Sequence, residues 1–494
     1  MDGKFTRREM LQLGIAGAAG LALAPFSNPQ RRARNAGRVR NIIFMVADGM
    51  SAGVPSLADE FGKLVRGKGS FWHQLLQNPN ATLGFFDMAS LDSLVTDSSS
   101  ASSSWGSGSR IFNGWVNMLP DGTRLTPIAQ IVKAAGKKVG LVTTTRITHA
   151  TPAGFAAVQR SRDDEDAIAP QYLEVVDVLM GGGLRHYDPN LRPDKRDLLT
   201  EYTRKGYAFW NRREQVVSKE TPEKVLGLFY NSHLPFTIDH LHSEELKRSV
   251  PTLAEMTRKA LEILSRSPHG FLLQVEGGRV DHAAHANDAA AILWDQLAFD
   301  DAIEVVYQFA ARRDDTLVIV TSDHGNPNPG LNGMGAEYRQ SNTCFERLAL
   351  AKCSFERLPH HLQQRTPDAV REVLREQLGI EISREEADAL ASALANRMPT
   401  VWNRQHANLN GLLGEILSNY NGIGWTGTSH TADYVWLTAF GTGREEFHGL
   451  VRNTDAFYKM LKLFGLSHKN PTMSPQDARK YLSYRREPAL PHWV

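Results

Sequence analysis

Six short apolar runs are the feature that most constrains how this chain can fold. Each run is rich in leucine and β-branched residues, shows no alternation with polar residues, and ends in small or polar ones. Such runs suit strands that are buried on both faces of a parallel sheet. The runs are NIIFMVADGM (41–50), KKVGLVTTTRITHATP (137–152), VDVLMGGG (176–183), FLLQVEGGRVDHAAH (271–285), TLVIVTSDHGN (316–326) and ADYVWLTAFG (432–441).

Helical patterns lie between these runs. Residues 253–267 and 287–311 space their apolar side chains by three and four, which is typical of amphipathic helices. Strands that alternate with helices indicate the α/β class, with a central, mostly parallel sheet sandwiched by helices. The chain has 494 residues, 41% of them hydrophobic, which suffices for a large core and excludes a disordered protein. We expect a single domain over residues 41–494.

The segment 327–425 departs from this pattern. It combines polar loops with two expected helices, one over 368–378 and one starting at Ser383, where Ser383 and Glu386 have the spacing of a capping box. We interpret 327–425 as an inserted cap segment near the active site. It contains the two cysteines of the chain, Cys344 and Cys353, which could be bonded or free.

The N-terminal 40 residues are typical of a twin-arginine export signal followed by a basic leader. Arg7 and Arg8 precede an apolar run of about 16 residues, which is shorter than the roughly 20 residues that a membrane-spanning helix needs. We therefore expect a periplasmic or secreted protein with no transmembrane anchor in its mature form. Residues 1–40 hold a net charge of +6, so the overall +2 leaves −4 for the remainder, and nothing indicates nucleic-acid binding.

Carboxylates and imidazoles gather where the expected strands end. In open α/β sheets, ligands bind beyond the carboxyl ends of the strands. Mixed imidazole and carboxylate ligands suit zinc, whereas an oxygen-only set suits magnesium. Asp281 and His285 are four residues apart, which places both on one face of a helix. The residues at these ends are Asp48, Glu276, Asp281, His285, Asp323, His324 and, before the last strand, His430.

Six motifs together resemble the alkaline phosphatase family. They are DGM, VTDSSSAS, HATP followed by SR, QVEGGRVDHAAH, TSDHGN and SHTA, in the family's order from Asp48 to His430. The resemblance implies a serine nucleophile, two zinc ions and one magnesium ion. By position, it assigns Asp281, His285 and His430 to the first zinc, Asp48, Asp323 and His324 to the second, and Asp48, Thr151 and Glu276 to magnesium, with Asp48 bridging.

The resemblance also implies that Ser98, directly after Asp97, is the nucleophile. A serine is a weak nucleophile at neutral pH, and coordination to a metal ion is one way to activate it. The run ASLDSLV (89–95) resembles a strand that would carry Ser98 to the sheet edge, and a helix starting there would favour a phosphate dianion. The neighbouring hydroxyls of Ser99 and Ser100 are alternatives.

Further polar residues fit the same chemistry. Arg162 matches the family's phosphate-binding arginine, since a guanidinium offers paired donors to phosphate oxygens, and Arg160 is its rival. His149 and His282 resemble residues of the animal enzymes and some bacterial ones, where we expect them to act through water on metal or phosphate. Because His149 brings nitrogen to the magnesium site, that site could hold zinc or cobalt instead.

The expected function is hydrolysis of small phosphate monoesters to an alcohol and phosphate through a phosphoserine. A phosphodiesterase or sulfatase of the same superfamily, and a non-catalytic metal- or phosphate-binding relative, are the alternatives. The family also implies a homodimer.

Overall fold

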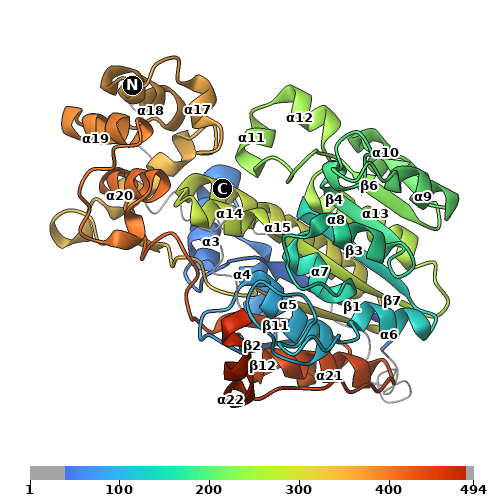
Figure 1. Cartoon of the computed structure of the whole chain (residues 1–494). Helices are drawn as coiled ribbons and strands as arrows, with labels where there is room; N and C mark the ends of the chain where they lie inside the picture. Colours follow the sequence, from blue (N-terminus) through green and yellow to red (C-terminus); the bar gives the residue numbers. More distant parts are fainter. Residues whose placement is uncertain (1–38, 485–494) are drawn as a thin grey trace.

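The computed structural model describes residues 39–484. Within them, ten strands form one sheet that lies between two layers of helices (Figure 1). The α/β class and the central, mostly parallel sheet are confirmed. In spatial order the strands are β12 (Gly449–Arg452), β2 (Ala81–Asp87), β11 (Val435–Gly441), β8 (Thr316–Thr321), β1 (Asn41–Ala47), β7 (Phe271–Gly277), β3 (Lys138–Arg146), β4 (Val178–Gly182), β6 (Val225–Leu228) and β5 (Ala208–Trp210).

The apolar runs form the centre of the sheet because both of its faces are covered. In β1, Ile43 and Met45 face one core, whereas Ile42 and Phe44 face the other, and all are fully buried. The first core packs against α3 (Val54–Arg66), α4 (Phe71–Leu76), α10 (Arg213–Val217), α11 (Thr237–Leu241), α12 (Glu244–Ser249), α13 (Leu253–Leu264), α14 (Arg279–His285) and α15 (Ala289–Ala310). The second packs against α5 (Ser98–Ser107), α6 (Ile128–Ala134), α7 (Ala150–Ala156), α8 (Glu165–Ile168), α9 (Leu198–Arg204) and α21 (Asn453–Leu463). A short helix, α22 (Pro475–Ala478), joins a small third cluster.

Strand direction matters for the site. β11 pairs antiparallel with both β8 and β2, while the other pairings in this sheet are parallel. The amino end of β11 therefore lies at the edge where its neighbours have their carboxyl ends. His430, five residues before β11, is thereby brought to that edge.

The long helix α15 and its N-cap residue Asp288 hold three other segments of the chain in place. Their buried carboxylates accept backbone N–H groups: Asp288 from Phe355 (2.6 Å), Asp295 from Thr237 (3.1 Å), and Asp300 from Trp72 (2.7 Å). Burial raises the pKa of each of these three carboxyls to about 7.

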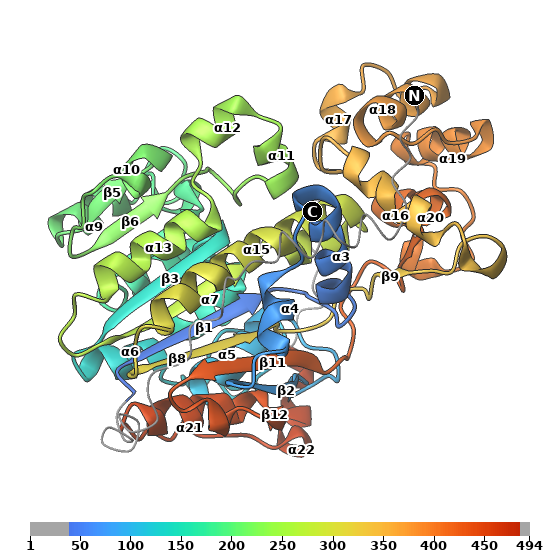
Figure 2. The same ribbon diagram turned by 180° about the vertical axis from the view of Figure 1, so that it is seen from behind.

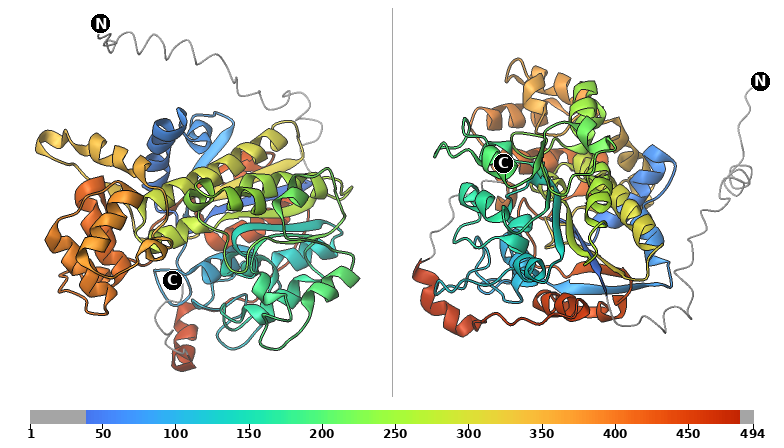
Figure 3. Two further views of the ribbon diagram at one scale, coloured as in Figure 1. Left: turned by 90° about the horizontal axis from the view of Figure 1, so that it is seen from above. Right: turned by 90° about the vertical axis from the view of Figure 1, so that its right-hand side faces the viewer.

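The segment 327–425 is richer in helices than predicted. The two expected helices are α18 (Pro367–Leu378) and α19 (Arg384–Leu394), the latter with the predicted capping box. They join α16 (Ser341–Glu346), α17 (Leu358–His361) and α20 (Leu409–Asn421) in a group that projects to one side of the sheet (Figure 3). At its base, β9 (Gly330–Leu331) pairs with β10 (Ile423–Gly424), and both Cys344 and Cys353 are free.

One strand prediction is wrong. Residues 89–95 do not extend the sheet, because β2 ends at Asp87 and the chain then turns. The Ser90 hydroxyl accepts the Ser93 N–H (3.0 Å) and donates to Asp92 (2.9 Å). Such local side-chain bonds compete with strand pairing.

The export signal and basic leader are predicted for residues 1–40. Of these, residues 1–38 lie outside the described residues. Over residues 39–484, no helix is both long and apolar enough to cross a bilayer.

Candidate active site

The carboxyl ends of adjacent strands bring the predicted residues together. Asp48 directly follows β1, Glu276 is the penultimate residue of β7, and Asp323 comes two residues after β8. β1 lies between β7 and β8, and Val46 is in register with both Glu276 and Thr321. Three acidic side chains from distant parts of the sequence thus meet at one buried point.

Asp48, Asp323 and His324 form the first part of the site. The Nε2 atom of His324 lies 3.5 Å from Oδ1 of Asp48 and 3.3 Å from Oδ2 of Asp323, and these side chains are fully buried. The Thr151 hydroxyl donates to the other oxygen of Asp48 (3.2 Å).

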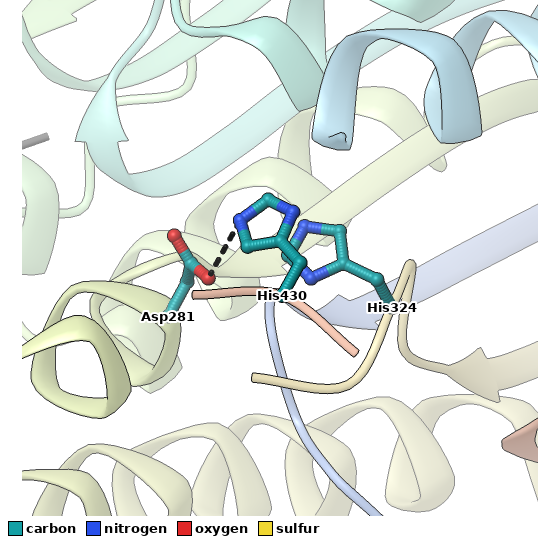
Figure 4. A group of neighbouring side chains, drawn as sticks. All are labelled: Asp281, His324 and His430. Carbon is teal, nitrogen blue, oxygen red and sulfur yellow. Dashed lines mark ion pairs between the residues drawn. The ribbon is translucent and has the colours of Figure 1, made fainter. Parts of the chain in front are cut away.

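Asp281, His285 and His430 form the second part. Helix α14 places His285 Nε2 3.5 Å from Asp281 Oδ2, as the spacing of four predicts. His430 Nε2 lies 3.9 Å from Asp281 Oδ1, and its ring stacks on that of His324 with centroids 3.7 Å apart. Figure 4 shows Asp281, His324 and His430 converging.

Backbone carbonyls determine which nitrogen of these rings faces the carboxylates. Nδ1 of His285 contacts the Thr428 oxygen (2.7 Å), and Nδ1 of His430 contacts the Thr96 oxygen (2.8 Å). A carbonyl oxygen only accepts, so each Nδ1 carries the proton and each Nε2 of the neutral ring carries a lone pair. Nδ1 of His324 similarly contacts the Gly325 oxygen (3.3 Å). We call His285, His324 and His430 the carbonyl-backed imidazoles.

This arrangement suits a cation. The Nε2 atoms of His285 and His430 are 3.0 Å apart, and two lone pairs at that distance do not form a hydrogen bond with each other. Burial lowers the pKa of His285 and of His324 to about 4, and that of His430 to about 3, so the rings are neutral at physiological pH. A divalent ion between such nitrogens would satisfy both.

The carboxylates lead to the same conclusion. Within the described chain, Oδ1 of Asp48, Oδ2 of Asp323 and Oε1 of Glu276 are buried without a hydrogen-bond partner. An unsatisfied buried polar atom costs about 1–3 kcal/mol, and more when charged. Burial raises the pKa of Asp48 well above its ordinary value, helped by Asp323, and raises that of Glu276 to about 7. Donor atoms of three sets lie within 4.8 Å of one another: Asp48, Asp323 and His324; Asp281, His324 and His430; and Asp48, His149 and Glu276.

Ser98 is the serine that faces this site. It is the first residue of α5, whose N-cap Asp97 accepts from the Ser100 N–H (2.8 Å). The Oγ atom of Ser98 lies 3.2 Å from His324 Nε2, the nitrogen that carries the lone pair. The Ser99 hydroxyl donates instead to Asp97 (2.6 Å), and that of Ser100 to the Ile111 carbonyl (2.9 Å).

Arg162, rather than Arg160, joins the site. Its guanidinium donates to Asp97 Oδ2 (3.1 Å) and to His149 Nε2 (3.0 Å). Arg160 is exposed and lies over the Trp115 ring, 5.1 Å from its centroid. Burial alone would raise the pKa of Asp97, but the charge of Arg162 holds it below its ordinary value, so Asp97 stays ionised beside Ser98.

Comparison with known proteins identifies the family. Residues 39–466 match the family model described as alkaline phosphatase. The chain belongs to the alkaline phosphatase family. Alkaline phosphatase 4 of Bacillus subtilis (strain 168) is 29% identical over 465 residues, covering 90% of this chain and 93% of the relative.

Solved structures agree. The crystal structure of Thermus thermophilus alkaline phosphatase is 34% identical, with a TM-score of 0.85 and coverage of 98% of this chain and 100% of that one. The crystal structure of a cold-active alkaline phosphatase from Shewanella sp. is 28% identical, with a TM-score of 0.70. The match covers 86% of this chain and 99% of that one. Alkaline phosphatases hydrolyse phosphoric monoesters with divalent metal ions, so the expectation of a metal-dependent phosphomonoesterase is confirmed.

A second group of imidazoles adjoins this cluster of carboxylates and imidazoles. The rings of His149 and His282 have centroids 5.6 Å apart, and that of His233 lies 5.4 and 4.3 Å from them. An arginine contacts each ring: Arg162 donates to His149, Arg279 to His282 Nδ1 (2.9 Å), and Arg146 contacts His233 Nε2. We call His149, His233 and His282 the guanidinium-backed imidazoles.

A guanidinium imposes the opposite polarity from a carbonyl. It only donates, so in His149 and His282 the contacted nitrogen of the neutral ring must accept and the other nitrogen carries the proton. His233 differs, because both of its ring nitrogens face N–H groups of Arg146. Burial lowers the pKa of all three rings well below the ordinary value, and the guanidiniums lower it further. The protonated nitrogen is therefore Nδ1 in His149 and Nε2 in His282.

Sequence reasoning missed His233. It lies in a loop after β6, a strand of only four residues, and no motif surrounds it. The rule that found the other residues, a polar side chain after a short apolar run, would have found it too.

Proposed function

We propose that this protein is an exported alkaline phosphatase that cleaves phosphate monoesters through a phosphoserine on Ser98, at a site for two zinc ions and one magnesium ion. The observation that carries the proposal is the position of Ser98 Oγ, 3.2 Å from an unprotonated ring nitrogen within the cation-binding cluster.

The residues present fit three ions. Asp281, His285 and His430 would hold one zinc, Asp48, Asp323 and His324 the other, and Asp48, Thr151 and Glu276 the magnesium. The bound ions would supply positive charge that favours the ionised serine and the developing charge of the reaction. Because Arg162 occupies the His149 lone pair, the third site keeps an oxygen-only ligand set, which supports magnesium over zinc or cobalt.

The protein's own groups would then act on the ester. The N-terminus of α5 favours a dianion, and Arg162, held by the ionised Asp97, presents its guanidinium to the phosphoryl oxygens. Ser98 Oγ attacks phosphorus, the bond to the alcohol oxygen breaks, and the serine proton is lost as the alcohol gains one. Water then cleaves the phosphoserine, which releases inorganic phosphate and restores Ser98.

Labelling of the enzyme tests this proposal. Replacing Ser98 by Ala should abolish covalent labelling from a phosphate-labelled monoester at acid quench, lower kcat by roughly 10³-fold or more, and leave the metal content intact. Ser99→Ala is the matched control, since that hydroxyl contacts Asp97 and not His324, and it should still be labelled. Labelling that persists without Ser98, or that disappears with Ser99 alone, would contradict the assignment.

A choice of substrate tests the ester class. Release of nitrophenol from the mono-ester should exceed release from the bis-ester, because Arg162 and the third site are suited to a terminal phosphoryl group. Preference for the bis-ester or for a sulfate ester would favour the superfamily alternatives.

Three further parts of the proposal rest on other features. We propose export because residues 1–40 hold a twin-arginine sequence, and we expect no nucleic-acid binding because of the charge distribution. We propose a homodimer because the family implies one. The division into one domain with a cap at 327–425 is supported by the β9–β10 pairing at the base of that segment.

A further inference from the structure

Helix α14 holds three side chains of the site, and the cap segment packs against the turn where this helix ends. Asn287 lies in that turn, two residues after His285. A Cβ atom at Gly414 of α20 would overlap the Cβ atom of Asn287, so the two segments approach as closely as a glycine allows. Figure 2 shows α20 on the side of the cap segment where β9 lies. The cap segment therefore touches the main body beside His285.

Thr428 is a second link between the cap segment and the main body. Its hydroxyl accepts a hydrogen bond from the side-chain amide of Asn408 (3.1 Å) and donates one to the Gln405 carbonyl (3.2 Å). The preceding Gly427 is buried, and a Cβ atom there would lie 2.9 Å from that of Gln405. The cap segment thus holds residues 427 and 428 from one side.

The N-terminus of α20 fixes the direction of the Asn408 amide. Asn408 is the N-cap residue of this helix, and its Oδ1 accepts the Gly411 N–H (2.9 Å). A side-chain amide has one oxygen and one NH2 group, so use of the oxygen by the helix leaves the NH2 group as a donor. That NH2 group contacts Thr428. Helix capping and the contact to Thr428 are therefore made by opposite ends of one side chain.

On its other side, Thr428 holds His285. The Thr428 carbonyl accepts from Nδ1 of His285 (2.7 Å), which leaves Nε2 of that ring 3.5 Å from Asp281. The same loop continues to His430, whose Nε2 lies 3.0 Å from that of His285. A shift of Thr428 would therefore free the tautomer of one ring and move the other.

We propose that Asn408 is a positioning residue for the metal site. Through Thr428 it holds His285 in the tautomer and orientation that zinc ligation requires, and the cap segment thereby sets how slowly this zinc ion leaves. The inference rests on the proposed function, which assigns Asp281, His285 and His430 to one zinc ion. Partners behind a metal-bound imidazole typically contribute about 10- to 100-fold to metal affinity.

The rate of zinc loss from the metal-loaded enzyme tests the inference. The protein is mixed with excess EDTA, and the zinc that remains bound is measured over time after rapid desalting. Asn408→Ser keeps an N-cap oxygen, because serine caps helices about as well as asparagine does, but its side chain is too short to reach Thr428. One zinc ion per chain should then leave about fivefold faster, and the other at the natural rate.

A second variant shows whether the effect runs through Thr428. Thr428→Val removes the hydroxyl and keeps the carbonyl, so loss of the same zinc ion should accelerate by about tenfold. The double variant should match Thr428→Val alone, because both changes break the same contact. Independent effects would instead multiply to about 50-fold.

Asn332→Ser is the matched control. The Asn332 amide donates to the Gly422 carbonyl (3.2 Å) at the opposite end of α20, so this variant should lose zinc at the natural rate. A natural rate of zinc loss in Asn408→Ser, multiplied effects in the double variant, or equal acceleration in Asn332→Ser would overturn the inference. A natural enzyme that binds no zinc would refute the proposed function itself.

Discussion

Two groups of three imidazoles lie side by side at one edge of the sheet in the described part of the chain, and they differ in what stands behind each ring. Carbonyl oxygens stand behind His285, His324 and His430, which leaves lone pairs directed at carboxylates. Guanidiniums stand behind His149 and His282, which leaves an N–H group on the opposite nitrogen of each ring. The same residue type would therefore offer a metal ligand in one group, under the proposed assignment, and it offers an N–H donor in the other.

The largest effect should come from the carbonyl-backed group. His430→Asn removes a nitrogen that we propose as a zinc ligand, so we expect zinc content to fall by about one ion and kcat/KM to fall by about 10³-fold, equivalent to several kcal/mol of lost charge stabilisation. Metal analysis and steady-state kinetics measure both.

His448→Asn is the matched control. His448 also has a carbonyl behind its Nδ1, that of Glu445 (2.7 Å), but it is exposed and lies outside the carboxylate cluster. If His430→Asn retained its full zinc content, a carbonyl behind the ring would not be a sign of metal ligation here.

A smaller effect should follow from the guanidinium-backed group. His282→Ala should lower kcat/KM by about 10–100-fold, the range for residues that act on a site through a neighbour. The two zinc ions should remain, because the ring offers its proton and not a lone pair to the site. Loss of zinc from this variant would erase the distinction between the two groups.

The smallest effect, a change in stability with pH, should come from Asp300, a buried residue of α15 that lies outside both groups of imidazoles. Burial raises the pKa of Asp300 to about 7, so its charged form is penalised in the folded protein. The contribution of Asp300 to the free energy of unfolding should therefore be largest below about pH 4, where this carboxyl is protonated in both the folded and the unfolded protein. That contribution should be lost as the pH rises to about 7.

Asp300→Asn removes that dependence. Relative to the variant, the natural protein should lose on the order of 1–3 kcal/mol between pH 5 and pH 8 in urea unfolding of the metal-free form. The zinc content of the metal-loaded protein should not change. A parallel pH dependence in the two proteins would show that Asp300 does not titrate in this range.

Much of this site follows from one rule, that polar residues at the ends of buried parallel strands meet. The rule brings Asp48, Glu276 and Asp323 together, because the apolar runs before them can only pack inside a covered sheet. Helical spacing adequately predicts the pairing of Asp281 with His285.

Other features depend on contacts that the local sequence does not encode. An apolar run has no direction, so the antiparallel course of β11 is not readable from it. The carbonyl behind His285 comes from Thr428 and the one behind His430 from Thr96, both distant in sequence, so the local sequence does not show how these rings differ from His149 and His282. At residues 89–95 the apolar spacing favours a strand, but the Ser90 hydroxyl bonds make a turn more stable.

The course of β11 also sets an order of events during synthesis. Asp48 emerges from the ribosome early, whereas His430 follows about 380 residues later. A nascent chain that ends before His430 presents buried carboxylates and His285 without the ring that faces it, and β8 still lacks β11 as a neighbour. Under the proposed ligand assignment, full loading with metal would therefore require that β11 has already joined the sheet.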